Sequence, residues 1–297
     1  MLFWVASAES AVSGSLQAWG WNDYGQCDVP VGDDFVAAAC GDEHSLALKS
    51  DGSLVAWGRN NHGQTDVPAG NNFVAISAGA AHSMALKADG TVVTWGSNEY
   101  GQSNVRYEDD FVAISSRGYH SLALRANGAL VAWGYNNYGQ CSVPSGNDFV
   151  GIDAGGEFNL TFKADGSIVA WGDERHGQLN IPMGIVSASA GGAFSVGLNP
   201  DGSLVAWGEN DFGQLNVPAG NDFVDIEGGG KYGLALKADG SLVGWGRNDH
   251  DQCDIPALNG FVDFTAGANH NLVITPEPAT LCLLGLGGLL LRRKCKS

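Results

Sequence analysis

Residues 73–105 decide the fold of this chain: they read Phe73-Val-Ala-Ile-Ser-Ala-Gly79, then His82-Ser-Met-Ala-Leu-Lys87, then Asp89-Gly-Thr-Val-Val-Thr-Trp-Gly96, then Gly101-Gln-Ser-Asn-Val105. In each piece apolar residues alternate with small or polar ones, which is the periodicity of a β-strand. Between the second and third pieces, an Asp-Gly pair supplies the positive φ of a tight hairpin turn. The stretch therefore predicts a small antiparallel sheet of four short strands.

This unit is repeated along the chain. A Trp-Gly pair marks its third piece and recurs every 38 residues, with one interval of 36, at Trp19, Trp57, Trp95, Trp133, Trp171, Trp207 and Trp245. The short interval has a local cause, because the fifth copy reads Pro182-Met-Gly-Ile-Val where the sixth reads Pro218-Ala-Gly-Asn-Asp-Phe-Val. Repetition of a four-stranded unit at this period is typical of a β-propeller.

The fourth piece of most copies ends in proline, at Pro30, Pro68, Pro144, Pro182, Pro218 and Pro256. Proline cannot donate to a sheet ladder and is confined to edge strands, so we expect the fourth strand to form the outer edge of each blade. The first strand ends in small residues such as Ala78 and Gly79, which fit the crowded region near a central axis.

The phase of the repeats indicates how the ring closes. The chain begins with a third and a fourth strand, at residues 13–20 and 26–30, and ends with a first and a second strand, at 261–267 and 270–275. The predicted fold is therefore all-β: a seven-bladed β-propeller of four-stranded antiparallel blades, closed by pairing of the N- and C-terminal strands. The predicted domains are 1–12, the remnant of an export signal or a disordered segment; 13–275, the propeller; and 276–297, a sorting or anchor tail.

The composition excludes several classes of function. The chain of 297 residues has a formal net charge of −17, which should repel nucleic acid and anionic membrane surfaces. None of its six cysteines forms a Cys-x-x-Cys pair, which argues against a zinc or redox site. We expect no cofactor and no metal.

The C-terminal tail has a distinct pattern. Pro276-Glu277-Pro278 precedes an apolar run over 279–291, which ends at the basic residues Arg292 and Arg293. The run is shorter than the ~20 residues of a transmembrane helix, and a basic cluster after it tends to stay cytoplasmic. At the other end, the Ala-x-Ala pattern at Ala6–Ala8 lacks a basic start and a full apolar run. Our hypothesis is that the coding start lies upstream and supplies a longer signal peptide.

The repeat resembles a known family. Trp95-Gly-x-Asn-x-x-Gly-Gln102, with segments such as His120-Ser-Leu-Ala-Leu124, is similar to the regulator of chromosome condensation repeat over residues 13–275. The short form with Gly-Gln-x-x-Val-Pro is more similar still to the propeller-type β-lactamase inhibitor protein of secreting bacteria. This resemblance implies a seven-bladed propeller but no single function, because such propellers include nucleotide exchange factors and enzyme inhibitors.

The tail resembles the PEP-CTERM sorting signal of Gram-negative biofilm bacteria. That resemblance implies an exosortase-type processing enzyme as a partner, with Pro276, Glu277 and Pro278 as the sorting motif. It also implies export to the cell surface or extracellular matrix, with membrane contact only through the tail.

No residue pattern indicates an active site. His44, His82, His120 and His270 occupy one repeat position, where other copies hold Phe158, Phe194 and Tyr232. A position that accepts all three rings is expected to pack a ring. The acidic residues mostly fall at repeated turn positions, and no nucleophile elbow or phosphate loop is present. We expect no enzyme and no catalytic residue.

Binding is expected on one face of the ring, where the loops after the first and third strands lie together. Rigid rings and arginines are the usual anchors of binding surfaces, and the candidates in these loops are Trp21, Arg59, Arg117, Tyr119, Tyr135 and Arg247. The predicted function is a monomeric, non-catalytic cell-surface or secreted propeller that binds a protein or polysaccharide. The alternatives are an inhibitor of a secreted enzyme, an exchange factor for a small GTPase, and a polysaccharide-active enzyme whose acids would be Asp42, Glu43 and Glu157.

Overall fold

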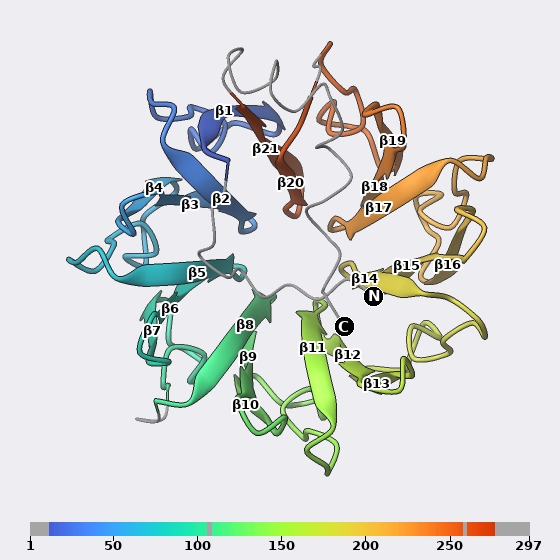
Figure 1. Ribbon diagram of the computed structural model, residues 1–297, viewed down its shortest axis with the longest axis horizontal. Coiled ribbons are helices and arrows are strands. Elements are labelled where there is room, and N and C mark those ends of the chain that lie inside the picture. The colour runs from blue at the N-terminus through green and yellow to red at the C-terminus, as the bar shows by residue number, and fades with distance from the viewer. Residues whose placement is uncertain (1–11, 106–108, 258–259, 277–297) are drawn as a thin grey trace.

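The computed structural model of the chain describes residues 12–105, 109–257 and 260–276, and every regular element within them is a β-strand. Figure 1 shows small sheets that radiate from a central axis. This arrangement is a β-propeller and confirms the all-β prediction. Residues 1–11 and 277–297, which include Glu277 and Pro278 of the predicted motif, lie outside the described residues.

In chain order the strands are β1 (Gly14–Gly20), β2 (Phe35–Cys40), β3 (His44–Lys49), β4 (Leu54–Gly58), β5 (Phe73–Ala78), β6 (His82–Lys87), β7 (Val92–Gly96), β8 (Phe111–Arg117), β9 (His120–Arg125), β10 (Leu130–Gly134), β11 (Phe149–Ala154), β12 (Phe158–Lys163), β13 (Ile168–Gly172), β14 (Ser187–Ala190), β15 (Phe194–Leu198), β16 (Leu204–Gly208), β17 (Phe223–Gly228), β18 (Tyr232–Lys237), β19 (Leu242–Gly246), β20 (Asp263–Ala266) and β21 (His270–Pro276).

Hydrogen bonds join these strands into six sheets within the described residues. Five sheets have three antiparallel strands that are consecutive in the chain, such as β5-β6-β7. The sixth sheet has the order β20-β21-β1-β2-β3-β4, and a single residue pair, Gly14 with Phe35, joins its two halves.

The predicted hairpin turn between the second and third strands is present. In β6–β7 the amide of Gly90 donates to the Lys87 carbonyl at 3.0 Å, and the Asp89 carboxylate accepts from the Thr91 amide at 3.0 Å. Gly90 has a φ of 85°, a left-handed conformation that favours glycine. The Asp-Gly pair therefore sets the register of the hairpin, as its sequence predicts.

The predicted fourth strand is wrong. After β7 the chain makes two successive turns, in which the Gly101 amide donates to the Asn98 carbonyl at 3.2 Å and the Asn104 amide donates to the Gly101 carbonyl at 3.0 Å. The Asn98 side chain also accepts from the Ser103 amide at 3.0 Å. Because these backbone groups are satisfied locally, the segment pairs with no strand, and the sheets have three strands where four were predicted.

The two ends of the described chain meet in one sheet. Strand β1 pairs antiparallel with β21 over seven residue pairs, from Gly14 with Pro276 to Gly20 with His270. Strands β20 and β21 thus supply the first and second strands of a unit whose third strand is β1, as the phase of the repeats predicts (Figure 1).

Neighbouring units are joined by a hydrogen bond from the repeated tryptophan. The indole Nε1 of Trp95 donates to the Gln64 carbonyl at 2.9 Å, and the Ser83 hydroxyl donates to the same oxygen at 2.9 Å. The same tryptophan bond recurs at Trp19–Gln252, Trp57–Gln26, Trp133–Gln102, Trp171–Gln140, Trp207–Gln178 and Trp245–Gln214.

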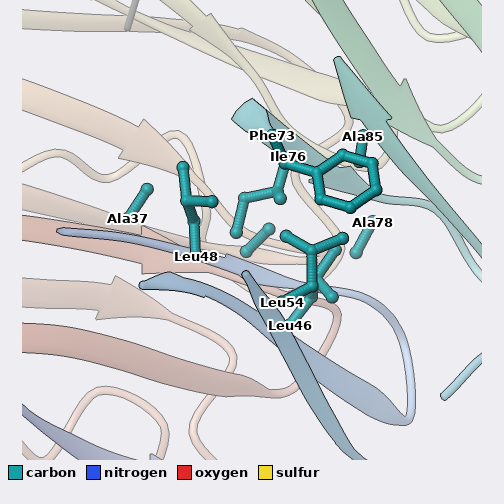
Figure 2. Close-up of a cluster of buried hydrophobic side chains, with 9 residues drawn as sticks. Ala37, Leu46, Leu48, Leu54, Phe73, Ile76, Ala78 and Ala85 are labelled. Carbon is teal, nitrogen blue, oxygen red and sulfur yellow. The ribbon is translucent and has the colours of Figure 1, made fainter. Parts of the chain in front are cut away.

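Apolar side chains fill the space between adjacent sheets. Figure 2 shows one such cluster, in which Leu46, Leu48 and Leu54 of β3 and β4 pack against Phe73 and Ile76 of β5. Phe73 is 3% exposed and Leu48 is 4% exposed. The core is therefore divided among the interfaces between units, and each unit depends on its neighbours.

Truncation of Leu48 tests this packing. Leu48→Ala should lower the free energy of unfolding by about 2–5 kcal/mol, because it removes a buried side chain and leaves a cavity between two sheets. Chemical denaturation measures the change. Val31→Ala, at a fully exposed side chain, is the control and should change stability by less than about 0.5 kcal/mol. Equal effects of the two substitutions would contradict the assignment of the core.

Candidate binding face

The four repeated histidines lie inside the ring and contact the next unit. His82 Nε2 is 2.9 Å from the Ser121 hydroxyl, which itself donates to the Gln102 carbonyl at 3.0 Å. Since that hydroxyl has one hydrogen, it accepts from His82, and Nε2 carries the ring proton. Burial lowers the pKa of His82 and His270 to about 3, and that of His44 and His120 to about 4. These rings are neutral packing groups, as their sequence position predicts.

The loops that face the axis consist largely of glycine. The Gly156 amide donates to the Gly192 carbonyl at 2.9 Å, the Gly192 amide to the Gly230 carbonyl at 3.1 Å, and the Gly230 amide to the Gly267 carbonyl at 3.0 Å. A Cβ on Gly192 would overlap the carbonyl oxygen of Gly230. At these glycines the inner loops leave no room for a side chain, and the aromatic groups of this face lie further out.

Four tyrosines form a continuous row in those outer positions. The ring centroids of Tyr119 and Tyr100 are 5.3 Å apart, those of Tyr100 and Tyr135 are 5.0 Å apart, and those of Tyr135 and Tyr138 are 6.2 Å apart. The guanidinium of Arg175 lies 4.1 Å from the centroid of the Tyr138 ring. We call Tyr100, Tyr119, Tyr135 and Tyr138 the tyrosine row. Tyr100 is 47% exposed and Tyr119 is 43% exposed.

A second aromatic group surrounds Trp21. Its ring centroid lies 5.5 Å from that of Tyr24 and 5.6 Å from that of His250. Arg59 also contacts this group, with its guanidinium 4.6 Å from the Tyr24 ring centroid, and forms an ion pair with Glu43.

Arg247 has partners on several sides. It donates to Asp249 at 2.6 Å and to the Asn269 side chain at 3.3 Å, and its guanidinium lies 5.3 Å from the Phe212 ring centroid. Arg247 is therefore fixed in place before any ligand arrives.

Arg117 has a different position from the other predicted residues. Its guanidinium donates to the carbonyls of Gly228 at 2.8 Å and Gly267 at 3.2 Å, which belong to β17 and to the loop after β20. It therefore joins β8 to distant parts of the ring at the axis. The structure thus brings Tyr119 together with Tyr135 through Tyr100, and Trp21 together with Arg59 through Tyr24. It places Arg117 at the axis, where it lines one cavity with Arg247.

Tyr24, Tyr100 and Tyr138 are not among the residues predicted to bind, because every repeat has a ring two residues before its glutamine and a ring at a repeated position indicates an architectural role. Their exposure and their contacts with the predicted residues make them part of this face. The signal that could have found them is chemical: several copies have tyrosine at this position, where Phe212 would serve equally well for packing.

Cysteine thiols support three of the loops on this face. The Sγ atoms of Cys27, Cys141 and Cys253 donate to the carbonyls of Trp21, Tyr135 and Arg247 at 3.3, 3.2 and 3.2 Å. Burial is the main reason that the pKa of each of these thiols is raised to about 12. They remain protonated, and each holds the backbone of a predicted binding residue.

A cavity of about 280 Å³ opens beside the tyrosine row and is lined by Asp42, Glu43, Arg59, Asn61, Glu99 and Tyr119, among others. Burial raises the pKa of Asp42, against the lowering effect of Arg117. Burial also raises the pKa of Tyr119, and the carboxylates of Asp42, Glu99 and Glu43 add to that shift. The cavity therefore has a negative potential along an aromatic wall. A second cavity of about 240 Å³ lies over the axis, between Asp42, Arg117 and the inner glycines.

These features define the chain as a β-propeller with one aromatic and charged loop face. A family model of the regulator of chromosome condensation (RCC1) repeat matches the chain at residues 35–64, 73–102, 111–140 and 185–214. Each match covers three strands and ends on a glutamine whose carbonyl accepts the tryptophan bond. A second family model matches the PEP-CTERM protein-sorting motif at residues 275–294.

Solved structures agree with the fold. Human WBSCR16 aligns with a TM-score of 0.74 and 18% identity over 89% of this chain and 99% of its own. Prp20p from Saccharomyces cerevisiae aligns with a TM-score of 0.75 and 16% identity over 93% of this chain and 95% of its own. The CRINKLY ectodomain of the Arabidopsis thaliana receptor kinase ACR4 aligns with a TM-score of 0.68 and 22% identity, over 82% and 96%. No curated protein matches the sequence.

The sorting motif indicates export and association with the cell surface of a bacterium, with processing by an exosortase-type enzyme. Across residues 12–105, 109–257 and 260–276, no helix is long and apolar enough to cross a membrane. The same residues contain no group of three or more His, Cys, Asp or Glu side chains that could hold a metal ion.

The neutral histidines predict acid sensitivity. A histidine whose pKa is lower in the folded state than in the unfolded state binds its proton mainly after unfolding. The free energy of unfolding is then at its full value above pH 6.5, the histidine pKa in the unfolded state. It falls as the pH drops toward about 3 to 4, the pKa of these histidines in the folded state. Each buried histidine should cost up to about 3 kcal/mol of stability between pH 6.5 and pH 4.

Denaturation of His82→Phe as a function of pH measures this contribution. The variant should lose less stability than the wild type between pH 6.5 and pH 4, because Phe cannot take up a proton. His62→Phe, at an exposed side chain of the loop face, is the matched control and should keep the wild-type slope. Identical slopes for all three proteins would mean that His82 is not held neutral by the fold.

Proposed function

We propose that this protein is a non-catalytic binding propeller, exported to the cell surface or extracellular matrix of a Gram-negative-type bacterium, that binds a polysaccharide or a protein through its loop face. The observation that carries the proposal is the tyrosine row beside the negatively charged cavity. The four rings contact one another edge to face, with centroids 5.0 to 6.2 Å apart. Tyr100 and Tyr119 are the exposed members of the row, and such rigid rings offer contact area with little conformational entropy to lose.

A polysaccharide suits this surface best. Sugar rings can stack on the exposed Tyr100 and Tyr119. Asp42, Glu99 and Asn61 at the cavity wall can accept hydrogen bonds from hydroxyl or amino groups. The negative potential favours neutral or amino sugars over acidic ones. Of the predicted residues, Tyr119 and Tyr135 are the primary contacts in this proposal, with Trp21, Arg59 and Arg247 at the periphery and Arg117 as a support at the axis.

A binding role fits the state of the acidic residues better than catalysis does. Glycoside hydrolysis needs two carboxyl groups across a scissile bond, one of them as acid. Glu43 forms an ion pair with Arg59, and Glu157 forms one with Arg175 at 2.7 Å. Asp42 lies beside Glu43, on a different unit from Glu157. We therefore infer that the face binds its ligand without turnover.

We further propose that the six-stranded sheet acts as two blades, β20-β21-β1 and β2-β3-β4, in a ring of seven. Two observations support this division: its halves share one residue pair, and the seven tryptophan–glutamine bonds supply one link for each of seven interfaces. Residues 13–275 then form one domain, monomeric and flanked by 1–12 and the tail 276–297.

Substitutions in the tyrosine row test the binding role. Tyr100→Ala and Tyr119→Ala should each weaken retention in affinity electrophoresis, on gels that contain neutral or amino polysaccharides, by about tenfold. Phe212→Ala removes a ring that is 44% exposed outside the row and is the matched control. Unchanged retention of both tyrosine variants, or an equal loss in the control, would contradict the proposed site. If secreted proteins are retained in place of any polysaccharide, the ligand is a protein.

A further inference from the structure

The strand that closes the ring overlaps the sorting motif. Strand β21 ends at Pro276, whereas the match to the PEP-CTERM motif begins at residue 275. In the closed ring Thr275 pairs with Ser15, and Pro276 pairs with Gly14 (Figure 1 shows β1 beside β21). Two residues therefore belong both to the propeller and to the signal.

These residues are packed into the body. Pro276 is buried, and the Thr275 hydroxyl donates to the Ser15 carbonyl at 3.3 Å. A Cβ on Gly14 would overlap the Thr275 carbonyl, so the two strands are in close contact at this end. The preceding residue of β21, Ile274, is fully buried with Leu16 in a core cluster. Buried side chains, in addition to the strand pairing, therefore hold the last residue pairs of β1 and β21 in place.

Enzymes that process a peptide commonly bind it as an extended strand through its backbone groups. In the closed ring, the backbone of Thr275 faces β1 and is engaged there. The same segment cannot face both β1 and a processing enzyme. We propose that ring closure and recognition by the exosortase-type enzyme compete for Thr275 and Pro276, so that sorting acts on the open ring and precedes closure.

The first test moves the motif away from the strand in the full chain, expressed in a cell that has the processing enzyme. Insertion of Gly-Ser between Ile274 and Thr275 leaves the inserted residues to pair with Ser15 and Gly14 of β1 and frees both Thr275 and Pro276. Pulse-chase labelling with intact-mass analysis should show processing about tenfold faster than in the wild type, because the competent fraction rises. An unchanged or slower rate would overturn the proposal.

The control insertion places the same two residues between Met183 and Gly184. Met183 is fully exposed, and this turn is the one that is two residues shorter than its counterparts. The control should be processed at the wild-type rate. Acceleration in the control as well would show that any insertion suffices, and would also overturn the proposal.

A second test locks the ring. Ser15→Cys with Thr275→Cys places a disulfide across a directly opposed pair of β1 and β21. Processing should fall by about tenfold when the bridge is formed and recover on reduction, whereas Thr275→Cys alone should not respond to reductant. Full processing of the locked chain would overturn the proposal. Neither test involves the ligand, so the result is independent of the proposed binding role.

Discussion

The bond between a tryptophan indole and a glutamine carbonyl is the interaction on which the rest of the structure depends. The carbonyl of Gln64 accepts both from Trp95 and from Ser83 of the next unit, so a buried acceptor is fully used and two sheets are fixed in one orientation. The glycine after the tryptophan allows this approach, because a Cβ on Gly96 would lie 3.0 Å from the Gln64 Cα. The Trp-Gly pair and the distant glutamine are therefore parts of a single contact.

The same glutamine also positions the candidate binding face. The glutamine side chain accepts a hydrogen bond from a backbone amide of its own loop. In one repeat, Gln102 Oε1 accepts from the Tyr100 amide at 2.9 Å. The backbone of Gln102 holds Trp133 of the next unit, while its side chain holds the exposed tyrosine. The architecture and the presentation of the tyrosine row thus depend on one residue type, which explains why the ring position always stands two residues before it.

The sequence predicts well the features that recur in many repeats, and it predicts poorly the features that depend on local hydrogen bonds or on a single residue. The period locates each hairpin, the closing pair of strands and the packed histidines, because each follows from a pattern present in many copies. The fourth strand was wrong, since residues such as Asn98 satisfy the backbone locally, and alternation of side chains cannot reveal that competition. Arg117 was expected in a loop with other binding residues, yet it crosses the axis to Gly228. Nothing local in the sequence indicates a contact so distant in the chain.

Charge distribution explains what the face can select. The arginines expected to bind a ligand already have partners: Arg59 pairs with Glu43, and Arg247 pairs with Asp249. Their charges are compensated, and their side chains instead hold the rings of Tyr24 and Phe212 in place through cation–π contacts. Burial and the carboxylates of Asp42 and Glu99 raise the pKa of Tyr119, so negative charge lies beside that ring, and Arg117 partly offsets the charge of Asp42.

Closure of the ring has a consequence for the order of events during synthesis. The described cysteines are free thiols, so among the described residues the two ends of the chain are joined in one unit by strand pairing and packing and not by a disulfide. Strand β1 precedes β21 by about 250 residues, and closing so long a segment costs loop-closure entropy, which slows the formation of their pairing. Until β21 arrives, the unit that contains β1 lacks its first and second strands. Because the sorting signal begins within β21, it becomes available at the same moment as the last strand of the ring. The competition between closure and sorting therefore follows from the overlap of β21 with the sorting motif.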